Sequence, residues 1–303
     1  MKGYRPLVSV IMNCYNSSRY LREAIESVYA QKYDNWEIVF WDNNSSDTSG
    51  EIANSFDSRL RYFKGEKTVP LGEARNLAIK ESKGELLAFL DCDDLWFPEK
   101  LYKQVPLFKR DEVGLVFCDT IFFNEQRDVK RLYERTPYKT GKCFDALLTA
   151  YFLSMETVVL RKSALLAQKY WFDPRFNMIE EADLFRRVAF QYELDMVPEV
   201  LAKWRIHQAS YTWNKSELMV SETDLSVESY KTIFPEFERQ YKHEIKLLKR
   251  GAHFSHAKIL IDAGRGAEAR KYLWSFSASF KGLMFLGYSF APAWVRKEYD
   301  RQN

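Results

Sequence analysis

Several features that mark particular classes of protein are scarce in this 303-residue sequence. It has four cysteines and no C-x-x-C pair, so it indicates neither a zinc site nor a disulfide framework, and we read the thiols as reduced. Glycine (12) and proline (9) are too few for a fibrous or disordered chain. A formal net charge of +3 is too small to indicate nucleic acid as a partner.

A secretion signal is also missing from the start of the sequence. The chain runs from Met1 to Pro6 into a strand-like segment, without the apolar stretch and cleavage site of a signal peptide. We therefore expect a cytoplasmic protein. With 46% hydrophobic and 29% charged residues, the composition is that of a folded protein, and its length allows one large domain with an appendage or two modest domains.

Strand-like and helix-like segments alternate through the first ninety or so residues. Short apolar runs are typical of strands covered on both faces, and apolar residues at the helical period indicate the helices between them. This alternation predicts an α/β fold with a mostly parallel, Rossmann-like sheet flanked by helices, whose ligand lies beyond the carboxyl ends of the strands. The predicted strands are 7–12, 37–41, 60–63 and 86–90, and the predicted helices are 18–28, 48–56 and 72–83, the last closed by Gly84.

The pattern becomes less regular after a further strand at 113–117. We expect one more strand at 157–160 and a helix at 180–192, and from about Ser216 onward only helices. The sequence therefore predicts an α/β domain at 1–215, which would carry the ligand site, and an α-helical region at 216–303.

Three carboxylates, Asp91, Asp93 and Asp94, follow directly after the apolar strand 86–90. Like charges this close raise one another's pKa, so a cation is the natural compensation. Magnesium in proteins typically uses one or two carboxylates together with substrate phosphates. The segment therefore predicts a site for a metal and a diphosphate. The other interpretation is a solvated acidic turn before the next helix, with Pro98 in its first turn.

Polar residues also follow the first two predicted strands. Asp42 ends the second, where a carboxylate can accept from a base or ribose, although it can equally cap the turn at Ser45. Asn13 and Tyr15 follow the first strand. Tyr15 can stack on a nucleobase or be a half-buried aromatic residue at a strand end.

Four segments together resemble family-two inverting glycosyltransferases, because their motifs occur in this order and at these strand ends. The resemblance extends from about Pro6 to Ser210. The loop after the first strand contains no glycine, which disfavours a dinucleotide-binding fold. The segments are Val8-Ser9-Val10-Ile11-Met12-Asn13-Cys14-Tyr15-Asn16, Asp42 with Asn44-Ser45-Ser46-Asp47, Gly72-Glu73-Ala74-Arg75-Asn76, and Asp91-Cys92-Asp93-Asp94.

The resemblance implies a glycosyltransferase-A fold that binds a nucleotide-diphosphate sugar together with Mn²⁺ or Mg²⁺. Tyr15 and Asp42 would contact the base of the donor, Asp93 its ribose or the metal, and Asp94 the metal. Arg75 is similar to the family's arginine near the donor, where a guanidinium pairs with phosphate or an aspartate; the alternative is a surface salt bridge. The donor site implied in this way comprises Asn13, Tyr15, Asp42, Arg75, Asp91, Asp93 and His207.

The acceptor hydroxyl needs a base, because it is a poor nucleophile until its proton is removed. The segment Ile179-Glu180-Glu181-Ala182-Asp183 resembles the family's Glu-Asp segment at the start of a helix. The position of the family's catalytic aspartate is here Glu181, a departure that leaves proton transfer possible with a longer reach. Asp183 is the second candidate. Alternatively, these acids merely favour the positive end of the helix dipole.

Two further segments suggest contacts. Trp204-Arg205-Ile206-His207 resembles a family segment that folds over the donor phosphates, which implies that His207 contacts phosphate or metal, although a single histidine is more often structural. Residues 270–296 form an amphipathic, aromatic and basic stretch. Such a stretch can lie in a membrane interface, which suits a lipid-carried acceptor, or can pack on the catalytic domain.

These observations predict a metal-dependent, inverting glycosyltransferase that acts on a hydroxyl of a saccharide or lipid-linked saccharide, with no nucleic-acid partner. A nucleotidyltransferase is disfavoured, because no glycine- and lysine-rich loop for a triphosphate follows the first strand. A silent nucleotide-sugar-binding or scaffold protein with the same fold is the alternative, and Glu181 in place of aspartate is its best argument.

Overall fold

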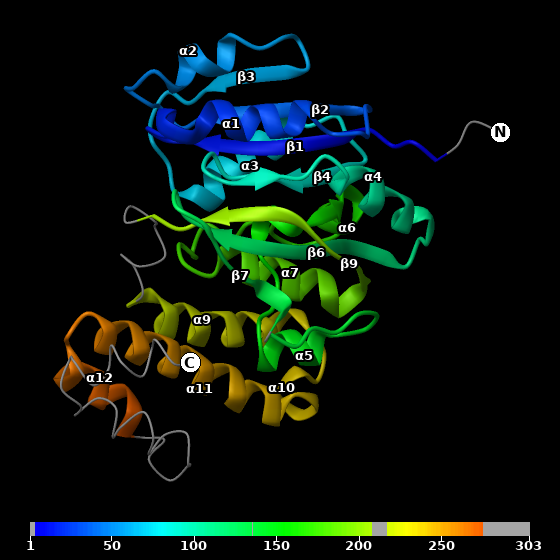
Figure 1. The fold of residues 1–303 in the computed structure, drawn as a ribbon. Helices are drawn as coiled ribbons and strands as arrows, with labels where there is room; N and C mark the ends of the chain where they lie inside the picture. The colour runs from blue at the N-terminus through cyan, green and yellow to red at the C-terminus, as the bar shows by residue number, and fades with distance from the viewer. Residues whose placement is uncertain (1–3, 135, 208–216, 275–303) are drawn as a thin grey trace. The chain divides into compact units, whose positions relative to one another are not determined.

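The computed structural model describes residues 4–134, 136–207 and 217–274. The chain divides into two compact units. One comprises Met1–Leu147 and Tyr151–Ala209 and contains all strands of the sheet. The other comprises Leu148–Ala150 and Ser210–Asn303, and its described elements are helices. Figure 1 shows the α/β unit in blue to yellow-green and the described helices of the second unit in yellow to orange.

The first half of the sheet is parallel, in the order β3-β2-β1-β4. Each predicted strand and helix of this half is present, with ends shifted by a few residues. The strands are β1 (Val8–Cys14), β2 (Trp36–Asp42), β3 (Leu60–Lys64) and β4 (Leu86–Phe89), and the helices are α1 (Ser18–Tyr29), α2 (Ser49–Asn54) and α3 (Leu71–Glu81).

The second half of the sheet mixes directions, in the order β8-β6-β9-β5 after β4. Here β8 pairs antiparallel with both β4 and β6, whereas β6 and β9 are parallel. The predicted α/β class is confirmed. The continuous parallel part of the sheet is its first half, β3-β2-β1-β4. The strands are β5 (Leu95–Trp96), β6 (Val113–Phe123), β7 (Asp128–Arg131), which pairs with β6, β8 (Val159–Arg161) and β9 (Glu193–Arg205).

The sequence did not predict the long strand β9. Pro198 lies inside it and cannot donate to a ladder, and acids alternate with apolar residues along its first half. The strand tolerates the proline because the register with β6 jumps from Val197 to Val200. Shorter elements complete the unit: α4 (Lys100–Gln104), η1 (Val105–Lys109), η2 (Leu132–Glu134), α5 (Phe144–Thr149), η3 (Met155–Thr157), α6 (Lys162–Leu166) and α7 (Glu180–Gln191).

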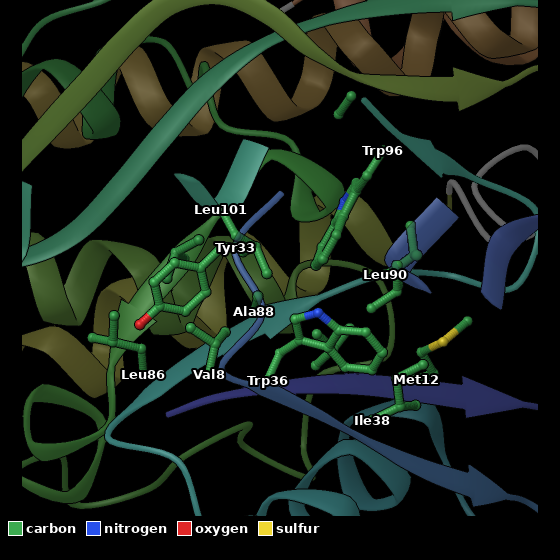
Figure 2. Close-up of a cluster of buried hydrophobic side chains, with 14 of the residues drawn as sticks. Val8, Met12, Tyr33, Trp36, Ile38, Leu86, Ala88, Leu90, Trp96 and Leu101 are labelled. Atoms are coloured by element: carbon green, nitrogen blue, oxygen red, sulfur yellow. The ribbon is translucent and has the colours of Figure 1, made fainter. Parts of the chain in front are cut away.

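One face of the sheet carries the larger apolar cluster, shown in part in Figure 2. Alternate residues of the parallel strands point into it, as the period of two along a strand requires. The buried side of α1 covers this face. Members include Val8, Val10 and Met12 of β1, Trp36 and Ile38 of β2, Leu86 and Ala88 of β4, and Leu21, Ala24, Ile25 and Val28 of α1.

The opposite face of β4 is packed against the segment that leads to α7. Phe89 points away from the cluster of Figure 2, and its ring lies 5.8 Å from that of Phe172 and 6.3 Å from that of Phe185 in α7. Helix α3 packs against β1 and β2, and the guanidinium of Arg75 in α3 lies over the Phe172 ring. This packing brings α3, the end of β4 and the start of α7 together.

Gly84 does not end a helix as predicted, because α3 finishes three residues earlier, at Glu81. Its lack of a side chain serves a close approach to β1 instead. A Cβ at Gly84 would lie 2.6 Å from both Leu7 O and Ser9 N. The glycine is therefore required by contact with the neighbouring strand.

The helical unit contains α9 (Leu218–Ile233), α10 (Phe237–Gln240), α11 (Lys242–Asp262) and α12 (Gly266–Leu273). Leu273, which the sequence placed on an amphipathic face, is fully buried in a cluster with residues of α11. Most of the stretch 270–296 lies outside the described residues. None of the described helices is long and apolar enough to cross a membrane.

Candidate active site

The loops after β1 and β2 are joined by hydrogen bonds at the carboxyl edge of the sheet. Asn16 and Asn44 have left-handed backbones, with φ of 50° and 67°, a conformation that asparagine tolerates better than most residues. The amide N–H of Asn16 donates to Ser45 Oγ (3.0 Å), and Asn16 Oδ1 accepts from the amide N–H of Ser46 (2.9 Å). The fold itself therefore holds the two loops together.

Asp42 ends β2 at this edge, and its side chain is buried. Its Oδ1 accepts from the amide N–H of Ser45 at 2.7 Å, and its Oδ2 accepts from the hydroxyl of Tyr62 at 2.6 Å. Asp42 thus holds the turn at Ser45. An ionised carboxylate has about four lone-pair sites, so these bonds leave it able to accept from a ligand as well.

Two buried side-chain donors lie where β1 and β2 end. Asn13 and Trp41 are register partners, so their side chains lie on the same face of the sheet. For Asn13 Nδ2 and Trp41 Nε1, no hydrogen-bond partner exists among the described residues. A buried donor without a partner is costly, so an acceptor supplied by a ligand would stabilise this edge. Nothing in the sequence distinguishes Trp41 as a site residue, because an aromatic residue in an apolar strand is typical of an ordinary core.

Tyr15 follows these residues and is 53% exposed. It is therefore not the half-buried strand-end aromatic that was the alternative to a stacking role. An exposed ring beside a ligand site can cover the face of a nucleobase.

The acids after β4 are in unequal surroundings. Asp91 is partly exposed, whereas Asp94 is buried and accepts from the amide N–H of Arg205 through Oδ1, at 2.8 Å. Burial raises the pKa of Asp94 well above its usual value, and the charges of Glu156, Asp93 and Asp91 raise it further. Asp94 is therefore not part of a solvated acidic turn.

Asp93 is paired with His207, whose Nε2 lies 2.8 Å from Asp93 Oδ2. Burial and the charge of Asp91 raise the pKa of Asp93, while His207 acts in the opposite direction. Arg205 fixes the same turn, because its Nε donates to the carbonyl of Asp93 at 2.8 Å. His207 therefore lies next to the acidic segment, and its contact with phosphate or metal stays a prediction.

Glu156, in η3, is a buried acid that the sequence did not select. Its Oε2 accepts from the Ser154 hydroxyl at 2.6 Å. Burial raises its pKa, and its charge contributes to the raised pKa of both Asp94 and Glu181. The one available signal was an acid inside the apolar stretch 152–159.

Arg75 joins two elements of the site from a buried position in α3. Its Nη1 lies 3.0 Å from Glu180 Oε1 at the start of α7, and its Nη2 lies 3.3 Å from Asp91 Oδ1 after β4. The guanidinium is 4% exposed, so it is not part of a surface salt bridge. It holds the beginning of α7 close to the end of β4.

The three acids at the start of α7 have different partners. Glu180 pairs with Arg75, and Asp183 forms a fully buried pair with Arg187 at 2.7 Å. Glu181 has no such arginine, and Tyr151 donates its hydroxyl to Glu181 Oε1 at 3.4 Å. Burial raises the pKa of Glu181 to about 8; Arg75 lowers this pKa, whereas Glu180, Asp91 and Glu156 raise it. Such a pKa lies close to the value that suits a general base near neutral pH.

The acidic residues after β4 could supply some, but not all, of the ligands that a divalent cation needs. No three His, Cys, Asp or Glu side chains in the part of the chain that the structure describes are arranged to hold a metal by themselves. The carboxylates of Asp93 and Asp94 are nevertheless crowded and carry raised pKa values. Because magnesium typically uses one or two carboxylates and takes its remaining ligands from substrate phosphates and water, these residues fit a cation that arrives with a diphosphate.

Comparison with known proteins identifies the family of the chain. The family described as glycosyl transferase family 2 matches residues 9–190, more than half of the chain. The chain belongs to glycosyl transferase family 2. The matched residues include all of the predicted site except His207.

Relatives at the sequence level carry glycosyltransferase names. The chain is 29% identical over 265 residues to an uncharacterised glycosyltransferase of Rickettsia typhi, covering 82% of this chain and 77% of that protein. It is 28% identical over 225 residues to UDP-Glc:alpha-D-GlcNAc-diphosphoundecaprenol beta-1,3-glucosyltransferase WfgD of Escherichia coli, covering 72% and 85% of the two chains.

Solved structures show the same fold. The mannosyltransferase PcManGT from Pyrobaculum calidifontis, solved with GDP-Man and Mn²⁺, superposes with a TM-score of 0.62 at 18% identity, over 94% of this chain and 79% of that chain. S. aureus TarS 1–349, solved with UDP, gives a TM-score of 0.62 at 18% identity, over 98% and 92%. The glycosyltransferase-A fold implied by the sequence motifs is confirmed.

Proposed function

We propose that the protein transfers a sugar from a nucleoside-diphosphate donor to a hydroxyl group, in one displacement with inversion. The observation that carries the proposal is the gathering of acids with raised pKa values, Asp93, Asp94 and Glu181, around the carboxyl end of β4. In a family-two fold the donor would bind at this edge of the sheet. The acids there could hold the cation and accept the proton of the acceptor. This enzyme is favoured over a silent binding protein because the proposed base has a pKa suited to proton transfer.

Four residues at the ends of β1 and β2 would hold the nucleoside. Asn13 and Trp41 offer the unpartnered buried donors, Asp42 offers acceptor capacity, and the exposed ring of Tyr15 covers the base. A polar group of the base or ribose would replace the missing partners.

Asp93 and Asp94 would hold the Mn²⁺ or Mg²⁺, with His207 next to Asp93. When bound, the cation supplies Lewis-acid stabilisation of the departing diphosphate. The residues of the chain itself prepare for this charge: Arg205 fixes the backbone of Asp93 and the carboxylate of Asp94 through two hydrogen bonds. Asp94 is buried and Asp93 is partly exposed, and a positive charge beside them would offset the repulsion between their carboxylates.

Glu181 would act as the base, taking the proton of the acceptor hydroxyl as that oxygen attacks the anomeric carbon. Arg75 would place it, because it ties Glu180, the preceding residue, to Asp91. Asp183, the second candidate for the base, is better explained as a stabilising residue, since its carboxylate is fully buried against Arg187.

For the acceptor, we propose a saccharide or lipid-linked saccharide in the synthesis of a cell-surface polysaccharide or glycoconjugate, by analogy with the acceptor in the name of WfgD. A cytoplasmic location and a contact of residues 270–296 with the inner face of the membrane would suit such an acceptor. Both are predictions.

Metal-dependent turnover of a panel of UDP- and GDP-sugars tests the proposal. The wild-type protein is expected to release nucleoside diphosphate with Mn²⁺, and Asp94→Asn to lose this by about a hundredfold or more. Asp145→Asn, which changes an exposed acid paired with Lys139, serves as the control. Undiminished turnover in Asp94→Asn, or a wild-type protein indifferent to manganese and sugar nucleotides, would contradict the proposal.

A further inference from the structure

The proposed base differs from an aspartate by one extra methylene, which adds a rotatable bond. Fixing a glutamate side chain costs up to about 1.5–2 kcal/mol of conformational entropy. The carboxylate of Glu181 therefore needs a contact that selects its position. Glu180 and Asp183, its neighbours on α7, have buried arginine partners for this purpose, whereas Glu181 does not.

The hydroxyl of Tyr151 supplies the contact. It lies 3.4 Å from Glu181 Oε1, and within residues 4–134, 136–207 and 217–274 it is the only hydrogen-bond donor recorded for that carboxylate. Burial raises the pKa of Tyr151 well above its usual value, and the charge of Glu181 adds to this. The phenol therefore keeps its proton and can donate whenever Glu181 is ionised.

The ring of Tyr151 is itself held in place by two kinds of contact, with a guanidinium and with an apolar cluster. The guanidinium of Arg186 lies over it, 5.3 Å from the ring centroid. Arg186 belongs to α7, and its side chain is held in turn by a hydrogen bond from Nε to the carbonyl of Leu147 at 3.1 Å. The ring also packs against an apolar cluster that contains Phe176, Ile179 and Ala182. A side chain held by packing in this way aims its hydroxyl with little freedom.

We propose that Tyr151 is a positioning residue that orients the carboxylate of Glu181 for proton abstraction from the acceptor. The proposal rests on the proposed function, in which Glu181 is the base. Tyr151 itself touches neither donor nor acceptor in this assignment. It acts through the hydrogen bond from its hydroxyl to Glu181.

The dependence on pH follows from all the groups that face Glu181. Arg75 from α3 favours its ionised form, whereas Glu180, Asp91 and Glu156 disfavour it. The Tyr151 hydroxyl donates to the ionised form and therefore also favours it. Removing that hydroxyl should move the acidic limb of the pH–rate profile to higher pH.

The test compares Tyr151→Phe with Tyr133→Phe in the full-length protein, with Mn²⁺ and whichever sugar nucleotide is turned over. Tyr133 is a matched control, because its hydroxyl also donates one bond, to the carbonyl of Phe152 at 2.6 Å, but does not contact Glu181. For Tyr151→Phe we expect kcat to fall about tenfold, with KM for the donor within about twofold and the acidic limb shifted upward. Tyr133→Phe should leave the limb in place.

A double-mutant cycle with Glu181→Asp shows whether Tyr151 acts through the base. The shorter aspartate cannot reach the same hydroxyl, so Tyr151→Phe should have little further effect in that background. An equal loss in both backgrounds, or an unmoved acidic limb in Tyr151→Phe, overturns the proposal for Tyr151. If instead Glu181→Gln keeps its activity, the assignment of the base fails, which is a different result.

Discussion

Two acidic regions at the carboxyl edge of the sheet are built in opposite ways. In the loop after β2, Asp47 accepts from the amide N–H groups of Ser18 and Ser49. Although burial acts to raise its pKa, these hydrogen bonds lower the pKa of Asp47 to about 2. Around the end of β4, burial raises the pKa of Asp94 and of Glu181 instead.

The direction of the pKa shift distinguishes acids that stabilise the fold from acids that are candidates for binding a ligand or for catalysis. Asp47 satisfies the first turn of α1 from a neighbouring loop, so its charge stabilises the native state. Asp94 is buried and Glu181 is partly buried, both near other carboxylates. Their charged forms are disfavoured until a cation or a hydrogen-bond donor is present. Groups that are costly to ionise in a cleft are candidates for function.

The substitution Glu181→Gln is expected to have the largest effect of the tests of this comparison. We expect turnover to fall by about a hundred- to ten-thousand-fold, because glutamine cannot accept the proton of the acceptor. Binding of the donor, measured by the thermal shift that nucleoside diphosphate and Mn²⁺ produce, should change little. Full activity in this variant would place Glu181 with the structural acids.

Removing the ion pairs that Arg75 forms with Glu180 and Asp91 should lower the stability of the protein as well as its activity. Arg75→Met breaks the buried ion pair with Glu180 and the contact with Asp91, and we expect a loss of about 3–5 kcal/mol in the free energy of unfolding by urea. Arg110 is the matched control, since it contacts Glu112, Glu193 and Asp195 but is 51% exposed. Arg110→Met should change the urea midpoint little, and equal effects would show that burial does not decide the role of Arg75.

The smallest expected effect concerns stability against pH. A folded-state pKa of about 8 for Glu181, against an ordinary 4.5, means that the native state loses stability as pH rises from about 4.5 to about 8. The loss grows by about 1.4 kcal/mol for each pH unit above 4.5. Glu181→Gln removes it, so the substitution should raise Tm by about 3–6 °C already at pH 5.5. At pH 4.5 the two proteins should unfold at nearly the same temperature. A difference that stays constant with pH would contradict the raised pKa.

Local patterns predicted much of the fold. The apolar runs located β1 to β4, and the helical period located α1, α3 and α7 to within a few residues. The pattern failed at β9, where a proline and alternating acids hide a strand that is stabilised by its long pairing with β6. A strand of this kind is recognisable only from its partner.

The sequence by itself determined which acids follow which predicted strands, because their order along the chain is read directly. The Asp183–Arg187 pair was not among its predictions, although residues four apart meet on one face of a helix. Only the tertiary structure decided that Arg75 contacts Glu180, 105 residues away. It also decided that Glu156 lies among the acids of the site and that Tyr151 reaches Glu181. Such contacts depend on burial and on the direction of side chains across elements, which no spacing along the chain encodes.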